Sequence, residues 1–96
     1  MDLIHLSREK GFISRDNLIM VNANYKFLWL CELQKWLRET KDINIEIYCH
    51  KEKNNILWNW SGYYIKIQGL FTKGSNYHNT YEEALEEALL YYLNNI

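Results

Sequence analysis

Cysteine and histidine are the residues of this sequence best suited to nucleophilic or metal chemistry, and they stand side by side at Cys49 and His50. Activation of a thiol by an imidazole requires both side chains on the same side of the backbone. Successive residues of a strand point to opposite faces, so this pair is not expected to share a proton. The other histidines, His5 and His78, lie in separate segments without metal-ligand spacing. We therefore expect no catalytic residue, no metal site and no cofactor, and we interpret the protein as a non-enzyme.

Aromatic side chains in the middle of the chain could instead bind a partner. The candidate interface residues are Tyr48, Trp58, Trp60, Tyr64 and Lys66. If two helices cover one face of a small sheet, the opposite face is expected to carry these rings. Three uses remain open: residues 1–20 fold over the rings as a second core, the rings contact a second copy or another protein, or they stack on bases or sugars.

The segment after Thr80 contains the most regular helix pattern of the sequence. Thr80 and Glu83 have the spacing of a capping box, in which hydroxyl and carboxylate satisfy backbone amides at a helix start. Four glutamates fall on the outer face, near the positive end of the helix dipole. The expected buried face consists of Tyr81, Ala84, Leu85, Ala88, Leu89, Tyr92, Leu93 and Ile96.

A second long helix is predicted from about Asn24 to Thr40. Residues 43–50 then alternate isoleucine or cysteine with polar or aromatic residues, which is typical of a strand with one buried face. The expected buried face of the helix consists of Tyr25, Leu28, Trp29, Leu33, Trp36 and Leu37, with Phe27, Leu30 and Cys31 widening it.

The remaining segments have weaker patterns. Residues 51–55 are expected to form a hairpin turn, with the asparagine pair accepting positive φ, and residues 56–68 to contain a second strand. Ser61 and Gly62 indicate a bulge or bend in that strand, and a short third strand is expected around 76–78. Residues 1–20 are read as a short helix stopped by Gly11, followed by another turn of helix or an irregular arm.

Together these elements predict an α+β fold in the order (α)-α-β-β-(β)-α. Two long helices pack on one face of a small antiparallel sheet of two or three strands. The chain of 96 residues, 48% of them hydrophobic, is expected to form a single domain spanning 1–96, because two cores would each be marginally stable.

The net charge of −1 conceals a split along the chain. Residues 1–79 carry +3 and residues 80–96 carry −4. A double-stranded-RNA-binding domain has a similar element order, but it presents lysines where this chain has Glu82 and Glu83, which repel phosphates, so this end of the chain argues against a nucleic-acid partner. Neither a membrane span nor a secretory signal is found, and with Cys31 and Cys49 read as reduced packing residues we expect a cytoplasmic protein.

Three segments carry a resemblance to a known family. Residues 30–39 (LCELQKWLRE), 43–47 (INIEI) and 80–89 (TYEEALEEAL) resemble short uncharacterised proteins encoded in phages and integrated mobile elements of anaerobic gut bacteria. The likeness covers about residues 24–93, but residues 58–79 and the last seven residues depart from the family pattern. The resemblance implies a small α+β domain and a mobile-element setting, and it brings no catalytic or binding residue.

These observations favour a non-enzymatic module that binds a protein partner or a second copy of itself. The contact surface is expected to be the aromatic sheet face or the acidic final helix. The alternative hypothesis is a weak nucleic-acid-binding protein that uses Lys51, Lys53, Lys66 and the tryptophans of the hairpin.

Overall fold

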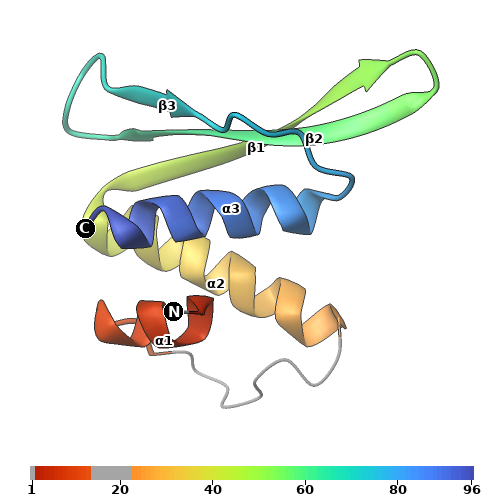
Figure 1. The fold of residues 1–96 in the computed structure, drawn as a ribbon. Helices are drawn as coiled ribbons and strands as arrows, with labels where there is room; N and C mark the ends of the chain where they lie inside the picture. The colour runs from red at the N-terminus through yellow and green to blue at the C-terminus, as the bar shows by residue number, and fades with distance from the viewer. Residues whose placement is uncertain (1, 14–22) are drawn as a thin grey trace.

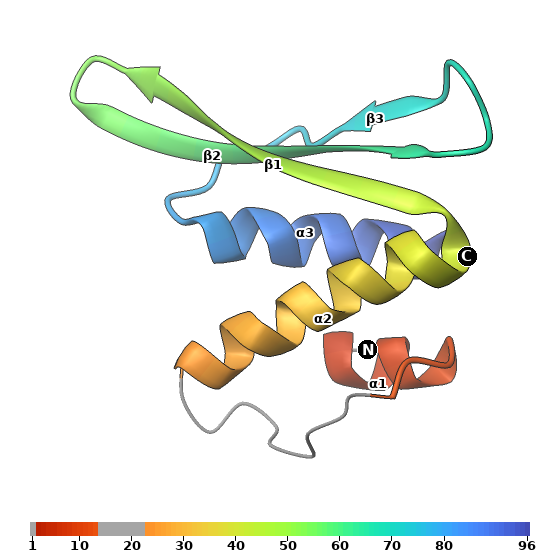
Figure 2. The ribbon, with the colours of Figure 1, turned by 180° about the vertical axis from the view of Figure 1, so that it is seen from behind.

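The computed structural model describes residues 2–13 and 23–96 of the chain. Its elements are α1 (Leu3–Glu9), α2 (Ala23–Lys41), β1 (Ile43–Glu52), β2 (Asn55–Tyr64), β3 (Phe71–Lys73) and α3 (Tyr81–Asn94). The three strands form one antiparallel sheet in the order β1-β2-β3. Helices α3 and α2 lie against one face of the sheet, and α1 lies on the side of these helices away from it (Figures 1 and 2). The predicted α+β class and element order are confirmed.

Helix α3 begins as its capping box predicts. The Thr80 hydroxyl accepts a hydrogen bond from the Glu83 backbone amide at 3.2 Å and donates to its carboxylate at 3.0 Å. The first contact gives an acceptor to a backbone amide of the helix start. In the second, the Glu83 carboxylate accepts from the Thr80 hydroxyl, where a capping box has the Thr80 backbone amide as donor, so the hydroxyl half of the predicted box is confirmed. The predicted buried face is confirmed for Ala84, Leu85, Ala88, Leu89, Tyr92 and Leu93, which are all buried, while Tyr81 and Ile96 are partly buried against the core.

Helix α2 matches the predicted segment within one residue at each end. It stops before Asp42, whose positive φ of 56° is incompatible with continuing the helix. Its buried side chains are Trp29, Leu30, Leu33 and Leu37. The inclusion of Leu28 on the buried face was wrong, since 59% of that side chain is exposed. The apolar residues at 27–31 surround the helix, so their pattern alone does not set the rotation of this end.

Strands β1 and β2 pair without interruption from Ile43↔Tyr64 to Glu52↔Asn55. The bulge expected near Ser61 and Gly62 is therefore absent from this pair. Instead, the irregularity lies beside β3. Between the pairs Ser61↔Lys73 and Trp58↔His78 the chain advances by five residues after β3 but by only three residues in β2, so the extra residues bulge out of the ladder. The third strand begins at Phe71, earlier than predicted, and the predicted segment contributes only the bridge between His78 and Trp58.

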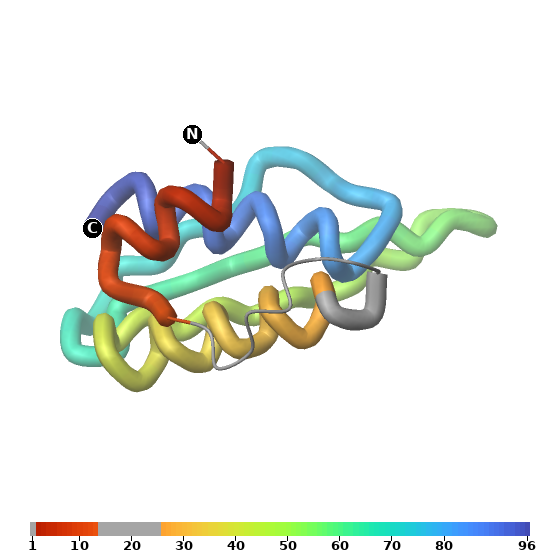
Figure 3. The backbone as a smooth tube through the Cα atoms, turned by 90° about the horizontal axis from the view of Figure 1, so that it is seen from below, coloured from red at the N-terminus to blue at the C-terminus, as the bar shows by residue number. Residues whose placement is uncertain are grey.

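The hairpin turn and the N-terminal segment also differ in detail from expectation. Positive φ occurs at Lys53, at 54°, rather than at the asparagine pair. The short helix before Gly11 is confirmed, and Gly11 itself has φ of 104°. In Figure 3, the view from below, α1 passes in front of α3, on the side of the helices away from the sheet. Residues 2–13 therefore do not cover the open face of the sheet. The expected further turn or arm at residues 14–20 lies outside the described residues.

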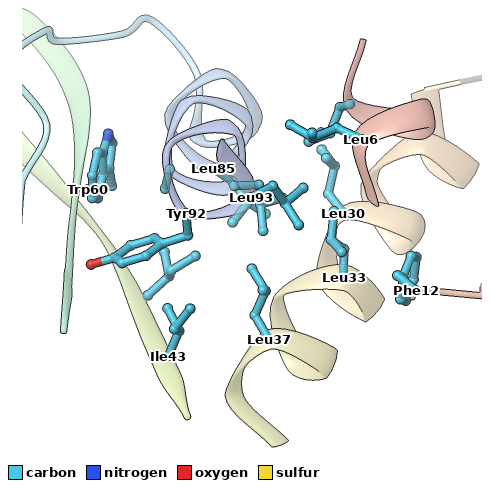
Figure 4. Close-up of a cluster of buried hydrophobic side chains, with 14 of the residues drawn as sticks. Leu6, Phe12, Leu30, Leu33, Leu37, Ile43, Trp60, Leu85, Tyr92 and Leu93 are labelled. Atoms are coloured by element: carbon cyan, nitrogen blue, oxygen red, sulfur yellow. The ribbon is translucent and has the colours of Figure 1, made fainter. Parts of the chain in front are cut away.

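The core is formed where α3 meets both the sheet and the other helices. Ile43 and Trp60 approach it from the sheet, Leu33 and Leu37 from α2, and Leu6 from α1 (Figure 4). Gly62 lets the Tyr92 side chain of α3 approach the backbone of β2, because a Cβ built on Gly62 would lie 2.3 Å from the Tyr92 hydroxyl oxygen. The glycine therefore makes room for the hydroxyl end of the Tyr92 ring against the backbone of β2.

The buried hydroxyl of Tyr92 predicts an alkaline pH dependence of stability. Burial raises the pKa of Tyr92 to about 12, partly offset by the neighbouring Thr72 hydroxyl. Because the unfolded chain releases this proton near pH 10, the free energy of unfolding should fall by about 2 kcal/mol between pH 10 and pH 12. Urea melts across this range should show that loss, and Tyr92→Phe should remove most of it. A Tyr63→Phe control should leave it in place; equal curves for the parent and the Tyr92 variant would contradict this assignment.

Candidate interaction surface

The predicted interface rings of β2 face the helices. Trp58, Trp60 and Tyr64 lie on the same face of the sheet as Ile43 and Ile47, because Tyr64 opposes Ile43 and Trp60 opposes Ile47 in the ladder. Trp60 is only 2% exposed. The expectation that these three rings lie on the face away from the helices was therefore wrong. A shift of one residue in the side-chain alternation exchanges the two faces of a strand, and the ladder with β1 places these rings on the helix side.

Contacts with α3 explain why the rings lie on this side. The Trp60 ring lies 5.3 Å from Tyr91 and 5.9 Å from Tyr92, between ring centroids. Trp58 lies edge-on to Tyr81 at 5.6 Å. Tyr64 makes the same kind of contact with Tyr92 at 5.9 Å. The contacts Trp58–Tyr81, Trp60–Tyr92 and Tyr64–Tyr92 are edge-to-face, a geometry that is favourable between aromatic rings, so they stabilise the helix-sheet packing.

The other two predicted residues lie elsewhere. Tyr48 opposes Asn59 on the face of the sheet away from the helices and is partly buried. Lys66 follows the end of β2, and its ammonium lies 3.2 Å from the Asp42 carboxylate. The five predicted residues therefore do not form one surface.

The cysteine and histidine side chains are each accounted for separately. His50 packs against the Tyr77 ring, with centroids 5.7 Å apart, and His78 pairs with the Glu87 carboxylate of α3. Cys49 is exposed on β1, while burial raises the pKa of the Cys31 thiol and so lowers its thiolate fraction. Among residues 2–13 and 23–96, no group of three or more His, Cys, Asp or Glu is placed to hold a metal ion.

A surface that the sequence analysis did not identify lies at one end of the sheet. We call it the apolar end patch, and its exposed members are Tyr63, Ile65, Ile67, Leu70 and Phe71. Their exposed fractions run from 37% for Tyr63 to 57% for Phe71. Together with Tyr64, Gln68 and Gly69, they line a hollow of about 290 Å³.

Backbone hydrogen bonds hold the segment that carries this patch. The Ile65 amide donates to the Asp42 carbonyl at 2.8 Å, and the Ile67 amide donates to the Tyr64 carbonyl at 3.1 Å. Gly69 then takes a φ of 84° before β3 begins. Strand β2 ends at Tyr64, and Ile65 and Ile67 follow it in the turn with exposed side chains. Gly69 was the one sequence signal that could have indicated this earlier strand end.

A second hollow, of about 340 Å³, lies between the third strand and α3 and is a weaker candidate. Trp60 contributes a buried indole nitrogen that has no hydrogen-bond partner within the described chain. This nitrogen lies at the end of the ring away from Tyr92 (Figure 4). A Cβ built on Gly74 would lie 2.4 Å from it, so the Gly74 backbone covers the nitrogen and keeps a ligand from reaching it.

The choice among these surfaces rests on their exposure and chemistry. The apolar end patch is exposed, whereas Trp60 is buried.

No described helix combines the length and the apolar character needed to cross a membrane. Comparisons of this chain with protein-family models, curated proteins and solved structures found no match.

Proposed function

We propose that this protein is a non-enzymatic module that binds another protein through the apolar end patch. The observation that carries the proposal is the exposure of Ile65, Ile67, Leu70 and Phe71 beside one hollow. Contiguous exposed apolar side chains of this kind are typical of protein interaction sites. Burying them against a partner removes apolar area from water, which favours association.

Nucleic acid binding has less support from the side chains. Stacking on bases requires exposed rings, but Trp60 is buried and Trp58 packs against Tyr81. The exposed lysines of the hairpin tip, Lys51 and Lys53, alternate with Glu52. This arrangement is a weak attractant for phosphates.

We further propose that the partner is cytoplasmic. If residues 24–93 belong to the phage and mobile-element proteins that they resemble, that partner is a host protein or a product of the same element. A second copy of the chain is the alternative partner. Both use the same patch, so the experiment must identify what contacts it.

Site-specific photocross-linking tests this proposal. A photoreactive residue at Leu70 should give a discrete protein adduct in cells, whereas the same residue at Ile56 should not. Ile56 is a matched control, because it is a 55%-exposed apolar residue at the other end of the same sheet. Mass spectrometry identifies the adduct, and sedimentation of the purified chain tests for self-association.

The identified partner should then bind the purified protein directly. Phe71→Ala should weaken that binding at least tenfold while leaving the melting temperature nearly unchanged, because the ring is 57% exposed. Equal adducts at Leu70 and Ile56, or none at Leu70, would refute the proposal.

A further inference from the structure

The outer edge of β3, which pairs with no other described strand, lies directly beside the apolar end patch. Trp58 and His78 exchange backbone hydrogen bonds, and the Gly74 amide donates to the Trp60 carbonyl at 2.9 Å. In an antiparallel ladder, hydrogen-bonded residue pairs alternate with pairs that are not hydrogen-bonded. Trp58 and Trp60 use their backbone groups toward the third strand, so Gly62, two residues further, is hydrogen-bonded to its partner Thr72. The peptide groups of Phe71 and Lys73 therefore point away from β2, along the outer edge of the sheet.

The same two residues present different chemistry on one face. Phe71 opposes Tyr63 in the ladder and Lys73 opposes Ser61, so both side chains lie on the face away from the helices. Phe71 lines the hollow of the apolar end patch. The Lys73 ammonium lies 5.8 Å from the Phe71 ring centroid and is exposed. The edge thus offers an apolar position and a cationic position two residues apart.

We propose that the apolar end patch and the β3 edge receive an extended segment of the partner that adds as a fourth strand and carries an apolar residue and an acidic residue two positions apart. This inference rests on the proposed function and specifies the partner's chemistry. Strand addition satisfies the outward peptide groups of Phe71 and Lys73, while side chains of the added strand provide specificity. Alternation places residues i and i+2 on one face, so an apolar side chain lies beside Phe71 and a carboxylate beside Lys73.

The opposite edge of the sheet is less suited to this role. On β1, the Gln34 side chain from α2 already donates to the Ile45 carbonyl at 2.9 Å. The far end of β1 carries the charged residues Lys51 and Glu52. Charged residues of this kind protect edge strands against pairing.

Labelled synthetic peptides provide the test, with fluorescence anisotropy as the readout. The probe is a ten-residue peptide in which valine and glutamate alternate at every second position, with threonine between them. One control replaces glutamate with lysine, and another replaces valine with serine. We expect the probe to bind the full-length protein at least tenfold more tightly than either control. Lys73→Glu should reverse the preference between the glutamate and lysine peptides.

Backbone methylation separates strand addition from simple apolar docking. In an added strand, the amides of every second residue face β3 and the amides between them face solvent. N-methylating the first set should reduce binding more than tenfold, whereas N-methylating the second set should leave binding nearly unchanged. Equal effects of the two sets would overturn strand addition. An amphipathic helical peptide that binds more tightly than the probe would also overturn it.

Two further outcomes separate this inference from the proposed function. If Leu70 cross-links a partner in cells but no extended peptide binds, the strand-addition inference fails and the protein-binding function stands. If the purified chain sediments as a dimer that Phe71→Ala dissociates, a second copy occupies the patch and the inference is wrong. Phe71→Ala and Lys73→Glu melts should match the parent, because both side chains are exposed.

Discussion

Replacing Trp60 with alanine is expected to lower the free energy of unfolding by about 3 to 5 kcal/mol, the range found for large aromatic residues deleted from cores. The ring is 2% exposed and contacts Tyr91 and Tyr92 of α3. Its removal leaves a cavity between the sheet and the helix, which the surrounding residues fill only in part. Urea denaturation at neutral pH measures the loss.

The matched control is Phe71→Ala, an aromatic truncation on the neighbouring strand. That ring is 57% exposed, so its removal should change stability by less than about 0.5 kcal/mol. The two variants should also differ in binding, since only Phe71 belongs to the apolar end patch. Equal stability losses, or a Trp60 variant that keeps full stability but loses its partner, would contradict the assignment of Trp60 to the core.

Leu85→Ala is expected to destabilise the protein by about 2 to 4 kcal/mol. Leu85 is fully buried on α3, the helix that contacts β1, β2, α1 and α2. Because several elements surround this position, they have little freedom to collapse into the space that the lost side chain leaves. Denaturant midpoints, with an unchanged dependence on denaturant concentration, give the size of the effect.

Glu86→Ala is the control for the orientation of α3. Glu86 pairs with Lys26 of α2, but the two side chains are 31% and 42% exposed. An exposed ion pair of this kind contributes little, so the change should stay below about 1 kcal/mol. A Glu86 effect as large as that of Leu85 would mean that α3 presents a different face to the core.

Local sequence was sufficient to determine the two long helices and the first strand. Thr80 and Glu83 specify the start of α3 through hydrogen bonds within one turn, and the spacing of its apolar residues specifies which face is buried. The alternation at Ile43, Ile45 and Ile47 likewise specifies β1. These features depend on residues within one or two turns, or within a single strand, so they can be read without tertiary contacts.

Only the tertiary structure decided which residues are available to a partner. Trp58, Trp60 and Tyr64 could form either face of β2, and the choice followed from pairing with β1 and packing against α3. The end of β2 at Tyr64 then determined that Ile65 and Ile67 lie in an exposed turn, outside the strand. A shift of one residue in register or a small change in strand length moves a side chain between core and solvent. Both depend on contacts between segments far apart in sequence, so the hydrophobic pattern predicted the fold class but not which of these apolar residues are exposed.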